Sequence, residues 1–124
     1  MEGYSVTISN TSKELTPKQR VMVKDTSDAI KLDDATKEND VIIDIDYFVV
    51  LDVHNEKSDN KDYKNYLLVD KSGEKYVTGS ESFFTSFMDI YAEMITSDEE
   101  WQIKAHRLPS KNYTGKEFLT CSLI

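Results

Sequence analysis

The stretch from Val41 to His54 alternates between apolar and polar residues. Its odd positions are all apolar, whereas its even positions include three aspartates and His54 on either side of Phe48 and Val50. A period of two predicts a β-strand. Because the middle of the run is apolar on both sides, we expect one long, bent strand that serves both halves of a curled sheet.

Shorter apolar runs predict four further strands, over residues 63–69, 75–78, 101–107 and 117–124. Asp70-Lys-Ser-Gly73 supplies turn chemistry between the second and third strands, since Gly73 can adopt a positive φ. Ser80 can cap a helix that runs to Ile95, because apolar residues recur there at steps of three and four. This order predicts a mainly β fold: an oligonucleotide/oligosaccharide-binding (OB) barrel of five strands, with one helix between strands 3 and 4.

The first 40 residues are polar and acidic, with short apolar clusters. Residues 4–8 alternate and predict a short strand, and residues 29–32 predict an edge strand. Thr16-Pro-Lys-Gln19 predicts the start of a helix, with Thr16 and Gln19 as the two members of a capping box. We therefore expect an N-terminal extension over residues 1–40 that packs on the barrel, and one OB domain over residues 41–124.

Composition and charge fit one soluble globular domain. Of 124 residues, 39% are hydrophobic and 31% are charged, which is ordinary for such a domain. The formal net charge of −8 argues against a surface coated with phosphate-binding lysines. The charge is uneven, however, because residues 101–124 carry four basic side chains against one acidic side chain, Glu117. We expect a polyanion to be drawn to the last two strands and the loop between them.

The sequence predicts a cytoplasmic protein. Asp44 and Asp46 interrupt the longest apolar stretch, so no membrane span is expected. The chain does not begin with a basic segment followed by an apolar core, so no secretory signal is expected. Cys121 is the single cysteine, and we expect it to be a small core residue that forms no disulfide.

Two expected loops combine aromatic residues with lysines, as the ligand-binding loops of an OB barrel do. The loop between the first two strands contains Lys57 and Tyr63. The loop between the last two strands contains Lys111, Asn112, Tyr113 and Lys116. Bases stack on aromatic rings at about 1–3 kcal/mol each, while cations follow the phosphates. The alternative interpretation is an exposed hairpin loop with solubilising lysines.

The strands themselves add further candidates for nucleic-acid binding. Lys104 and His106 alternate with apolar residues, so they are expected to point out toward solvent or ligand. Arg107 is expected to track phosphates together with Lys104. Tyr66 and Tyr76 lie on the middle strands, where OB proteins place stacking rings, and each is equally compatible with a core position.

No catalytic pattern competes with a binding function. Asp44 and Asp46 share one strand face, but no histidine or further acid joins them, so a solvated face is favoured over a metal site. The two histidines are far apart in sequence, and the chain lacks P-loop, dinucleotide-binding and zinc spacings. We therefore expect no enzyme activity, no cofactor and no metal.

The chain resembles small single-stranded-DNA-binding proteins of Gram-positive phages and mobile elements in three stretches: Asp70–Phe83, Ser110–Phe118 and Leu119–Ile124. The resemblance implies an OB barrel that coats single strands in a bacterial host cell, with Lys111, Tyr113 and Lys116 as contact positions. Many bacterial members end in a flexible acidic tail that recruits replication partners, whereas this chain stops inside a strand. The acidic N-terminal third is the expected substitute for that tail.

We therefore expect a non-catalytic, sequence-tolerant single-stranded-DNA-binding protein that acts in phage or mobile-element DNA replication, recombination or transfer. Its expected partners are single-stranded DNA and replication or recombination proteins but no membrane, and a homodimer is compatible with the sequence. The alternative is a small acidic phage-type inhibitor or anti-defence protein that mimics DNA, which the net charge of −8 favours. An OB module that binds protein alone is a third alternative.

Overall fold

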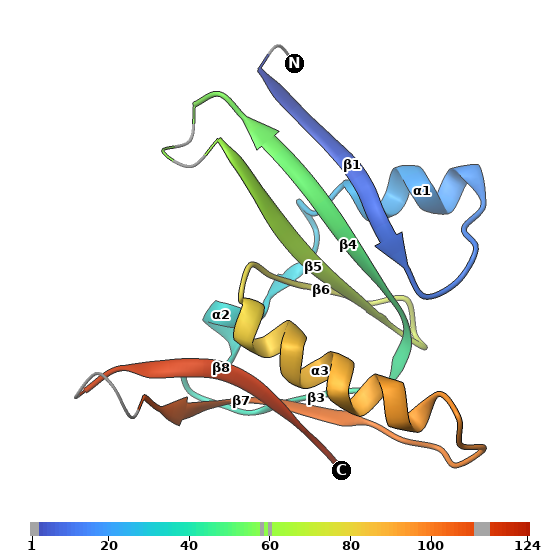
Figure 1. The fold of residues 1–124 in the computed structure, drawn as a ribbon, viewed down its shortest axis with the longest axis vertical. Coiled ribbons are helices and arrows are strands. Elements are labelled where there is room, and N and C mark those ends of the chain that lie inside the picture. The colour runs from blue at the N-terminus through green and yellow to red at the C-terminus, as the bar shows by residue number, and fades with distance from the viewer. Residues whose placement is uncertain (1–2, 58, 60, 111–114) are drawn as a thin grey trace. The chain divides into compact units, whose positions relative to one another are not determined.

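The computed structural model describes all residues except 1–2, 58, 60 and 111–114 (Figure 1). The described chain is mainly β, as predicted. In sequence order its elements are β1 (Tyr4–Thr11), α1 (Pro17–Lys24), β2 (Ile30–Lys31), α2 (Leu32–Ala35), β3 (Val41–Ile43), β4 (Ile45–Asn55), β5 (Asp62–Asp70), β6 (Lys75–Thr78), α3 (Glu81–Met94), β7 (Ile103–Pro109) and β8 (Glu117–Leu123). Over the described residues, we find no helix with the length and apolar character needed to cross a membrane.

The chain forms two compact units, each made of two segments. The first unit comprises residues 1–30 and 46–79, and the second unit comprises residues 31–45 and 80–124. The strands form a five-stranded sheet in the order β1-β4-β5-β6-β2 and a three-stranded sheet in the order β3-β7-β8. The larger sheet belongs to the first unit, apart from Lys31 at the end of β2 and Ile45 at the start of β4. The smaller sheet belongs to the second unit.

The apolar face of β4 forms the centre of the first unit's core. Its odd positions from Tyr47 to Val53 are at most 7% exposed, which confirms the face predicted from the alternation. Neighbouring elements add apolar side chains to the same core, including Leu15, Val23, Leu67, Val69 and Val77. β1 pairs antiparallel with β4, and its Val6 and Ile8 pack against this core.

Local sequence signals set the helix and the hairpin of the first unit as predicted. Thr16 Oγ1 accepts a hydrogen bond from Gln19 N at 3.2 Å, and Gln19 Oε1 accepts one from Thr16 N at 2.9 Å, which completes the capping box of α1. Gly73 has a φ of +93° in the turn between β5 and β6, a conformation that glycine adopts without strain. The predicted edge strand is present as β2, which has two residues and lies next to β6.

α3 lies along β8 in the second unit. Phe83 and Phe87 of this helix are completely buried, and Ser82 Oγ donates a hydrogen bond to Leu119 O of β8 at 2.9 Å. The helix begins at the predicted cap, because Ser80 Oγ accepts a hydrogen bond from Phe83 N at 3.2 Å. Beside the helix, β7 pairs antiparallel with β3 on one side and with β8 on the other.

The described strands form two sheets and no closed barrel, contrary to the finer prediction. The run from Val41 to His54 is interrupted at Asp44, and β3 pairs with β7 whereas β4 lies between β1 and β5. Closure of the predicted barrel would require the third and fifth predicted strands, β6 and β8, to meet. Instead β2 occupies the outer edge of β6, and α3 packs along β8.

The first 40 residues contribute β1, α1, β2 and α2. β1 and β2 are the two edge strands of the five-stranded sheet. Leu15 and Val23 belong to the core of the first unit, and Leu32 of α2 is fully buried. This segment therefore supplies core residues as well as surface.

Candidate nucleic-acid interface

One face of the β3–β7–β8 sheet carries the candidate interface. Ile43, Ile103 and Ala105 are fully buried, so the residues that alternate with them on β3 and β7 lie on the opposite side of the sheet. The antiparallel register places every second residue of β8 across from these positions. We call this surface the outer face, and its residues are Ile42, Lys104, His106, Leu108, Phe118 and Ser122. Thr120 has the same parity on β8, but it is 7% exposed and its Oγ1 donates a hydrogen bond to Ser86 Oγ of α3 at 2.9 Å, so the helix covers it.

The outer face has an exposed apolar pair near its hairpin end. Phe118 and Leu108 lie directly opposite each other, and the two residues are 38% and 43% exposed. Adjoining exposed apolar side chains are typical of an interaction surface. Phe118 is missing from the residues predicted for the site. The sequence nevertheless contains a signal for it, because Leu119 and Cys121 are core residues and the alternation then turns Phe118 outward.

Lys104 and His106 lie on the outer face, as the alternation predicts. Lys104 Nζ is 3.9 Å from Asp40 Oδ2, a separation that makes a weak ion pair for two partly exposed groups. His106 Nε2 is 2.8 Å from Ser122 Oγ across the β7–β8 ladder. The ring of His106 is therefore held against the sheet, whereas the ammonium of Lys104 can turn toward a phosphate at small cost.

Arg107, a predicted phosphate contact, lies on the other side of β7 from Lys104 and His106. Its Nε donates a hydrogen bond to Thr36 Oγ1 at 3.2 Å, and its terminal amino group donates to the backbone oxygen of Asp33. Both acceptors belong to α2 and the residue that follows it. Arg107 therefore ties β7 to α2, because its position on β7 has the opposite parity from that of Lys104.

The loop between β7 and β8 contains four of the predicted contact residues. Lys111, Asn112 and Tyr113 lie outside the described residues, so their roles stay predictions. Lys116 is exposed, and its backbone oxygen accepts a hydrogen bond from Ser110 N at 2.8 Å at the base of the hairpin. Gly115 has a φ of +79° there. Lys116 therefore lies at the hairpin end of the outer face, two residues before Phe118 in the sequence.

The predicted residues of the first unit do not form one binding surface. Tyr66 and Tyr76 are 6% and 9% exposed, because β5 and β6 are buried on both sides at these positions, so neither ring is a stacking platform. Burial raises the pKa of the Tyr76 hydroxyl, and the nearby charge of Asp70 raises it further. Tyr63 is half-buried and packs against the core, and Lys57 is exposed in the loop between β4 and β5.

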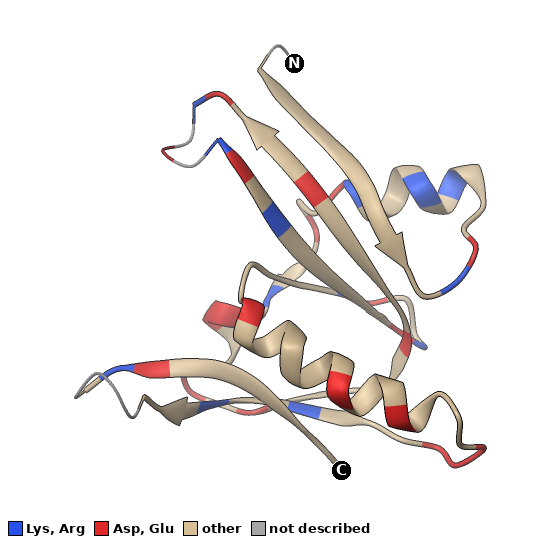
Figure 2. Ribbon diagram, in the orientation of Figure 1, with Lys and Arg blue, Asp and Glu red and all other residues tan. Residues whose placement is uncertain are grey.

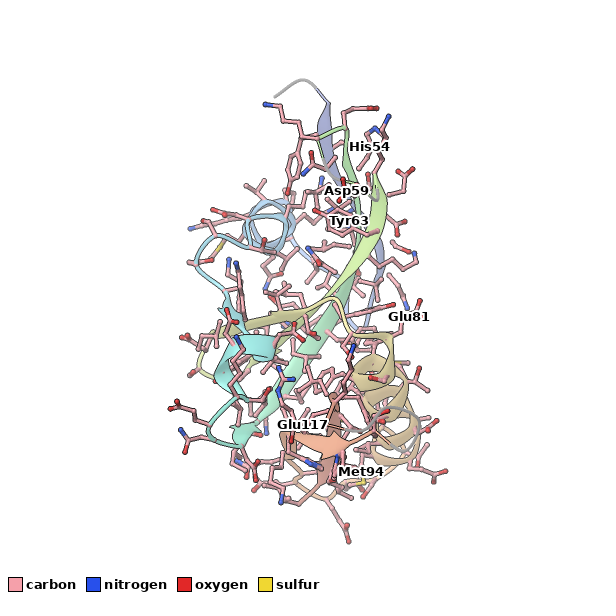
Figure 3. All side chains as sticks on the ribbon, turned by 90° about the vertical axis from the view of Figure 1, so that its left-hand side faces the viewer. His54, Asp59, Tyr63, Glu81, Met94 and Glu117 are labelled. Carbon is pink, nitrogen blue, oxygen red and sulfur yellow. The ribbon has the colours of Figure 1, made fainter. Side chains whose placement is uncertain are left out.

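The first unit has a polar hollow of about 460 Å³ on its sheet, lined by Ser5, Thr7, Asp52, Val53, His54, Asp62, Tyr63 and Lys64. His54 lies near Tyr63 at this place (Figure 3). The Nδ1 of His54 is 2.7 Å from Asp62 Oδ1, and its Nε2 is 2.6 Å from Glu56 Oε1. Lys64 Nζ forms an ion pair of 2.5 Å with Asp52 Oδ1.

Hydrogen bonds set the charge state of this hollow. The bond to Asp62, followed by the bond to Glu56, raises the pKa of His54, and the bond to His54 is the main cause that lowers the pKa of Glu56. Each ring nitrogen lies within hydrogen-bond distance of a carboxylate, an arrangement that favours the doubly protonated imidazolium. Within the described ranges, no three His, Cys, Asp or Glu side chains gather in a way that could hold a metal ion. The hollow is therefore a salt-bridged surface, which the sequence analysis missed because the pairing of β4 with β5 creates it.

No protein-family model, curated protein or solved structure matches this chain. The resemblance to phage single-stranded-DNA-binding proteins therefore stays a prediction. The candidate interface is defined by geometry: the pair Leu108 and Phe118, the polar side chains Lys104 and His106, and Lys116 at the hairpin.

Proposed function

We propose that this protein is a non-catalytic, sequence-tolerant binder of single-stranded DNA, and that the outer face holds the strand. The observation that carries the proposal is the exposed pair of Phe118 on β8 and Leu108 on β7, with His106 and Lys104 on the same strand as Leu108. An exposed ring on a sheet can stack on any base, because every base has a π-face. In this proposal Lys104 and Lys116 contact the phosphates of the strand.

The order and pairing of the strands support an OB-type topology. β3 and β4 together correspond to the first strand of an OB barrel, and they pair with β7 and β5, which correspond to its fourth and second strands. α3 lies between the third and fourth of these strands in sequence, as the plug helix of that fold does. We extend the proposal to phage or mobile-element DNA replication, recombination or transfer in the bacterial cytoplasm, on the basis of the sequence resemblance.

The number of cations predicts modest and salt-sensitive binding. The proposed phosphate contacts are Lys104, Lys111 and Lys116. Each contact on a single strand contributes about −0.7 to the slope of the logarithm of the binding constant against the logarithm of the salt concentration, so the three together give a slope of roughly −2. Affinity would then fall about 20-fold between 50 and 200 mM salt. Stacking on Phe118 must supply much of the remaining affinity.

Fluorescence anisotropy with labelled oligo-dT at low salt tests the proposal. We expect saturable binding with this salt slope, and Phe118→Ala should weaken it by about 5- to 150-fold, since one stacked base is worth about 1–3 kcal/mol. Leu123→Ala is the matched control, because Leu123 lies on the same strand, is 47% exposed and has the opposite parity. Absence of saturable binding at tens of micromolar protein (on the order expected for weak binders) overturns the function, and equal losses in the two variants overturn the location.

A second candidate function is a DNA-mimicking inhibitor that binds a basic protein. Residues 80–100 contain six acidic and no basic side chains, and α3 shows this charge clearly (Figure 2). Glu81, Asp89 and Glu93 are exposed on that helix. Under this function the protein would not bind oligo-dT and would instead displace it from a DNA-binding protein, so the same anisotropy assay separates the two candidates.

A further inference from the structure

β1 is a sheet edge whose own sequence has none of the usual guards against pairing, although α1 contacts part of this strand. Its eight residues, Tyr-Ser-Val-Thr-Ile-Ser-Asn-Thr, include no charged residue and no proline. Sheet edges are normally shortened, covered, or guarded by lysine or proline, because their free backbone groups pair with other strands. The other described edges are protected: β2 has two residues, β3 has three, and α3 packs along β8.

The register shows which backbone groups of β1 are free. Glu56 N donates to Gly3 O at 2.7 Å, at the end of the β1–β4 ladder. In an antiparallel pair, the residues that bond to the neighbour alternate with residues whose backbone groups point away. The N–H and C=O groups of Tyr4, Val6 and Ile8 therefore point away from β4. Within the described part of the chain, these outward groups have no hydrogen-bond partner.

We propose that this edge is a docking surface for a second copy of the same chain, joined by antiparallel pairing of β1 with β1. Val6 would lie opposite its own equivalent, and Tyr4 would lie opposite Ile8 of the second copy. This register uses every outward residue before the bulge between Ile8 and Asn10, where the strand bends. Its three hydrogen-bonded pairs supply about six hydrogen bonds, at two per pair.

The side chains of β1 are self-complementary in that register. On the core side, Tyr4 is 41% exposed and Val6 and Ile8 are half-buried. Pairing would place the ring of Tyr4 against Ile8 and cover the exposed parts of all three side chains. On the other side, Ser5 would lie beside Thr7 of the second copy. Aromatic–aliphatic and hydroxyl pairs across strands are both favourable.

The distribution of charge also favours this edge over the rest of the chain. The first unit holds 11 acidic and 9 basic residues, a net charge of −2, whereas the second unit holds 12 and 6, a net charge of −6. Two copies of a chain with a net charge of −8 repel each other. An uncharged strand in the nearly neutral unit is where a second copy meets the least repulsion.

Light scattering on charge-reversed variants tests the interface. The wild-type protein at about 100 μM (well above the dissociation constants of specific dimers) should have twice the mass of one chain, which is 14.3 kDa. Ser5→Lys combined with Thr7→Lys places like charges opposite each other twice in the proposed pair, and should raise the dimer dissociation constant about tenfold or more. Ser5→Glu combined with Thr7→Lys places opposite charges there, sets the lysine opposite Asp52 and the glutamate opposite His54 within each chain, and should keep the dimer. Both positions are exposed in the single chain, so far-UV circular dichroism should be unchanged.

Amide hydrogen exchange gives a test that needs no variant. At high protein concentration the amides of Val6 and Ile8 should be protected, and dilution should remove that protection. The amides of Ser5 and Thr7 bond to β4 and should stay protected at both concentrations. A wild-type mass of one chain at about 100 μM, exchange that does not depend on concentration, or equal dissociation of the two double variants would each overturn the proposal.

Discussion

Substitution of Arg107 shows whether this residue stabilises the fold or binds DNA. Sequence pattern placed it with Lys104 as a phosphate contact, whereas the structure ties it to Thr36 and Asp33. In Arg107→Ala, two charged hydrogen bonds are lost, each worth about 1.5–3 kcal/mol when well formed. Two factors reduce the cost: Arg107 is partly exposed, and Thr36 Oγ1 keeps its own hydrogen bond to Leu32 O at 2.7 Å.

We therefore expect Arg107→Ala to lower the free energy of unfolding by about 1–2 kcal/mol. The measurement is urea denaturation followed by the fluorescence of Trp101, the single tryptophan, which lies in the same unit with its ring 6.5 Å from that of Tyr91. With a urea dependence of about 2 kcal/mol per molar, the midpoint should fall by roughly 0.5–1 M. Arg107→Lys keeps the charge but not the forked geometry, so it should lose most of the same stability.

Lys104→Ala should weaken oligo-dT binding with little loss of stability, the opposite of the result expected for Arg107→Ala. Its ion pair with Asp40 is long and partly exposed, so the loss of stability should be under about 0.5 kcal/mol. On the proposed function, the salt slope of oligo-dT binding should fall by about 0.7, while Arg107→Ala leaves that slope unchanged. The reasoning is refuted if Arg107→Ala keeps its urea midpoint but weakens binding and lowers the slope as Lys104→Ala does.

Three further predictions concern single groups. Thr16→Ala removes the side-chain cap of α1 and should cost about 1 kcal/mol of stability in urea denaturation; an unchanged midpoint would contradict a role for the capping box. Burial raises the pKa of the Cys121 thiol to about 12, so a thiol reagent at pH 8 should react slowly until urea is added, and rapid labelling of the folded protein would contradict that burial. The raised pKa of His54 means that its bonds to Asp62 and Glu56 stabilise the fold below about pH 6.5 and lose this effect as pH rises through the raised value. An NMR titration should give a midpoint above 6.5 for this ring, and His54→Gln should remove that part of the pH dependence.

The elements of the chain could be predicted from local patterns. The capping residues Thr16 and Ser80 mark the starts of α1 and α3, because each satisfies backbone donors that the first turn leaves free. The alternation at 41–53 identifies the core face of β4, since one side of the strand must be buried. These signals act over a few residues, so the sequence contains them without reference to the rest of the fold.

The pairing of distant strands could not be predicted in the same way. The described strands form two sheets and not one closed barrel. β2, only two residues long, takes the edge of β6, and no local signal distinguishes that edge from a free one. Tyr66 and Tyr76 fit a stacking role equally well in sequence, and their burial depends on what covers both sides of their strands. Phe118 differs from them, because the alternation with Leu119 and Cys121 already indicates that it faces outward.

Each unit is made of two segments of the chain, and this limits how the chain can be divided into fragments. A fragment that starts at Val41 lacks Leu15 and Val23 from one core and Leu32 from the other. Truncation at such a point would remove packing from both units at once, and lost activity would then report unfolding instead of a missing contact. Assignment of function to surfaces on this protein therefore depends on point substitutions at exposed positions in the intact chain.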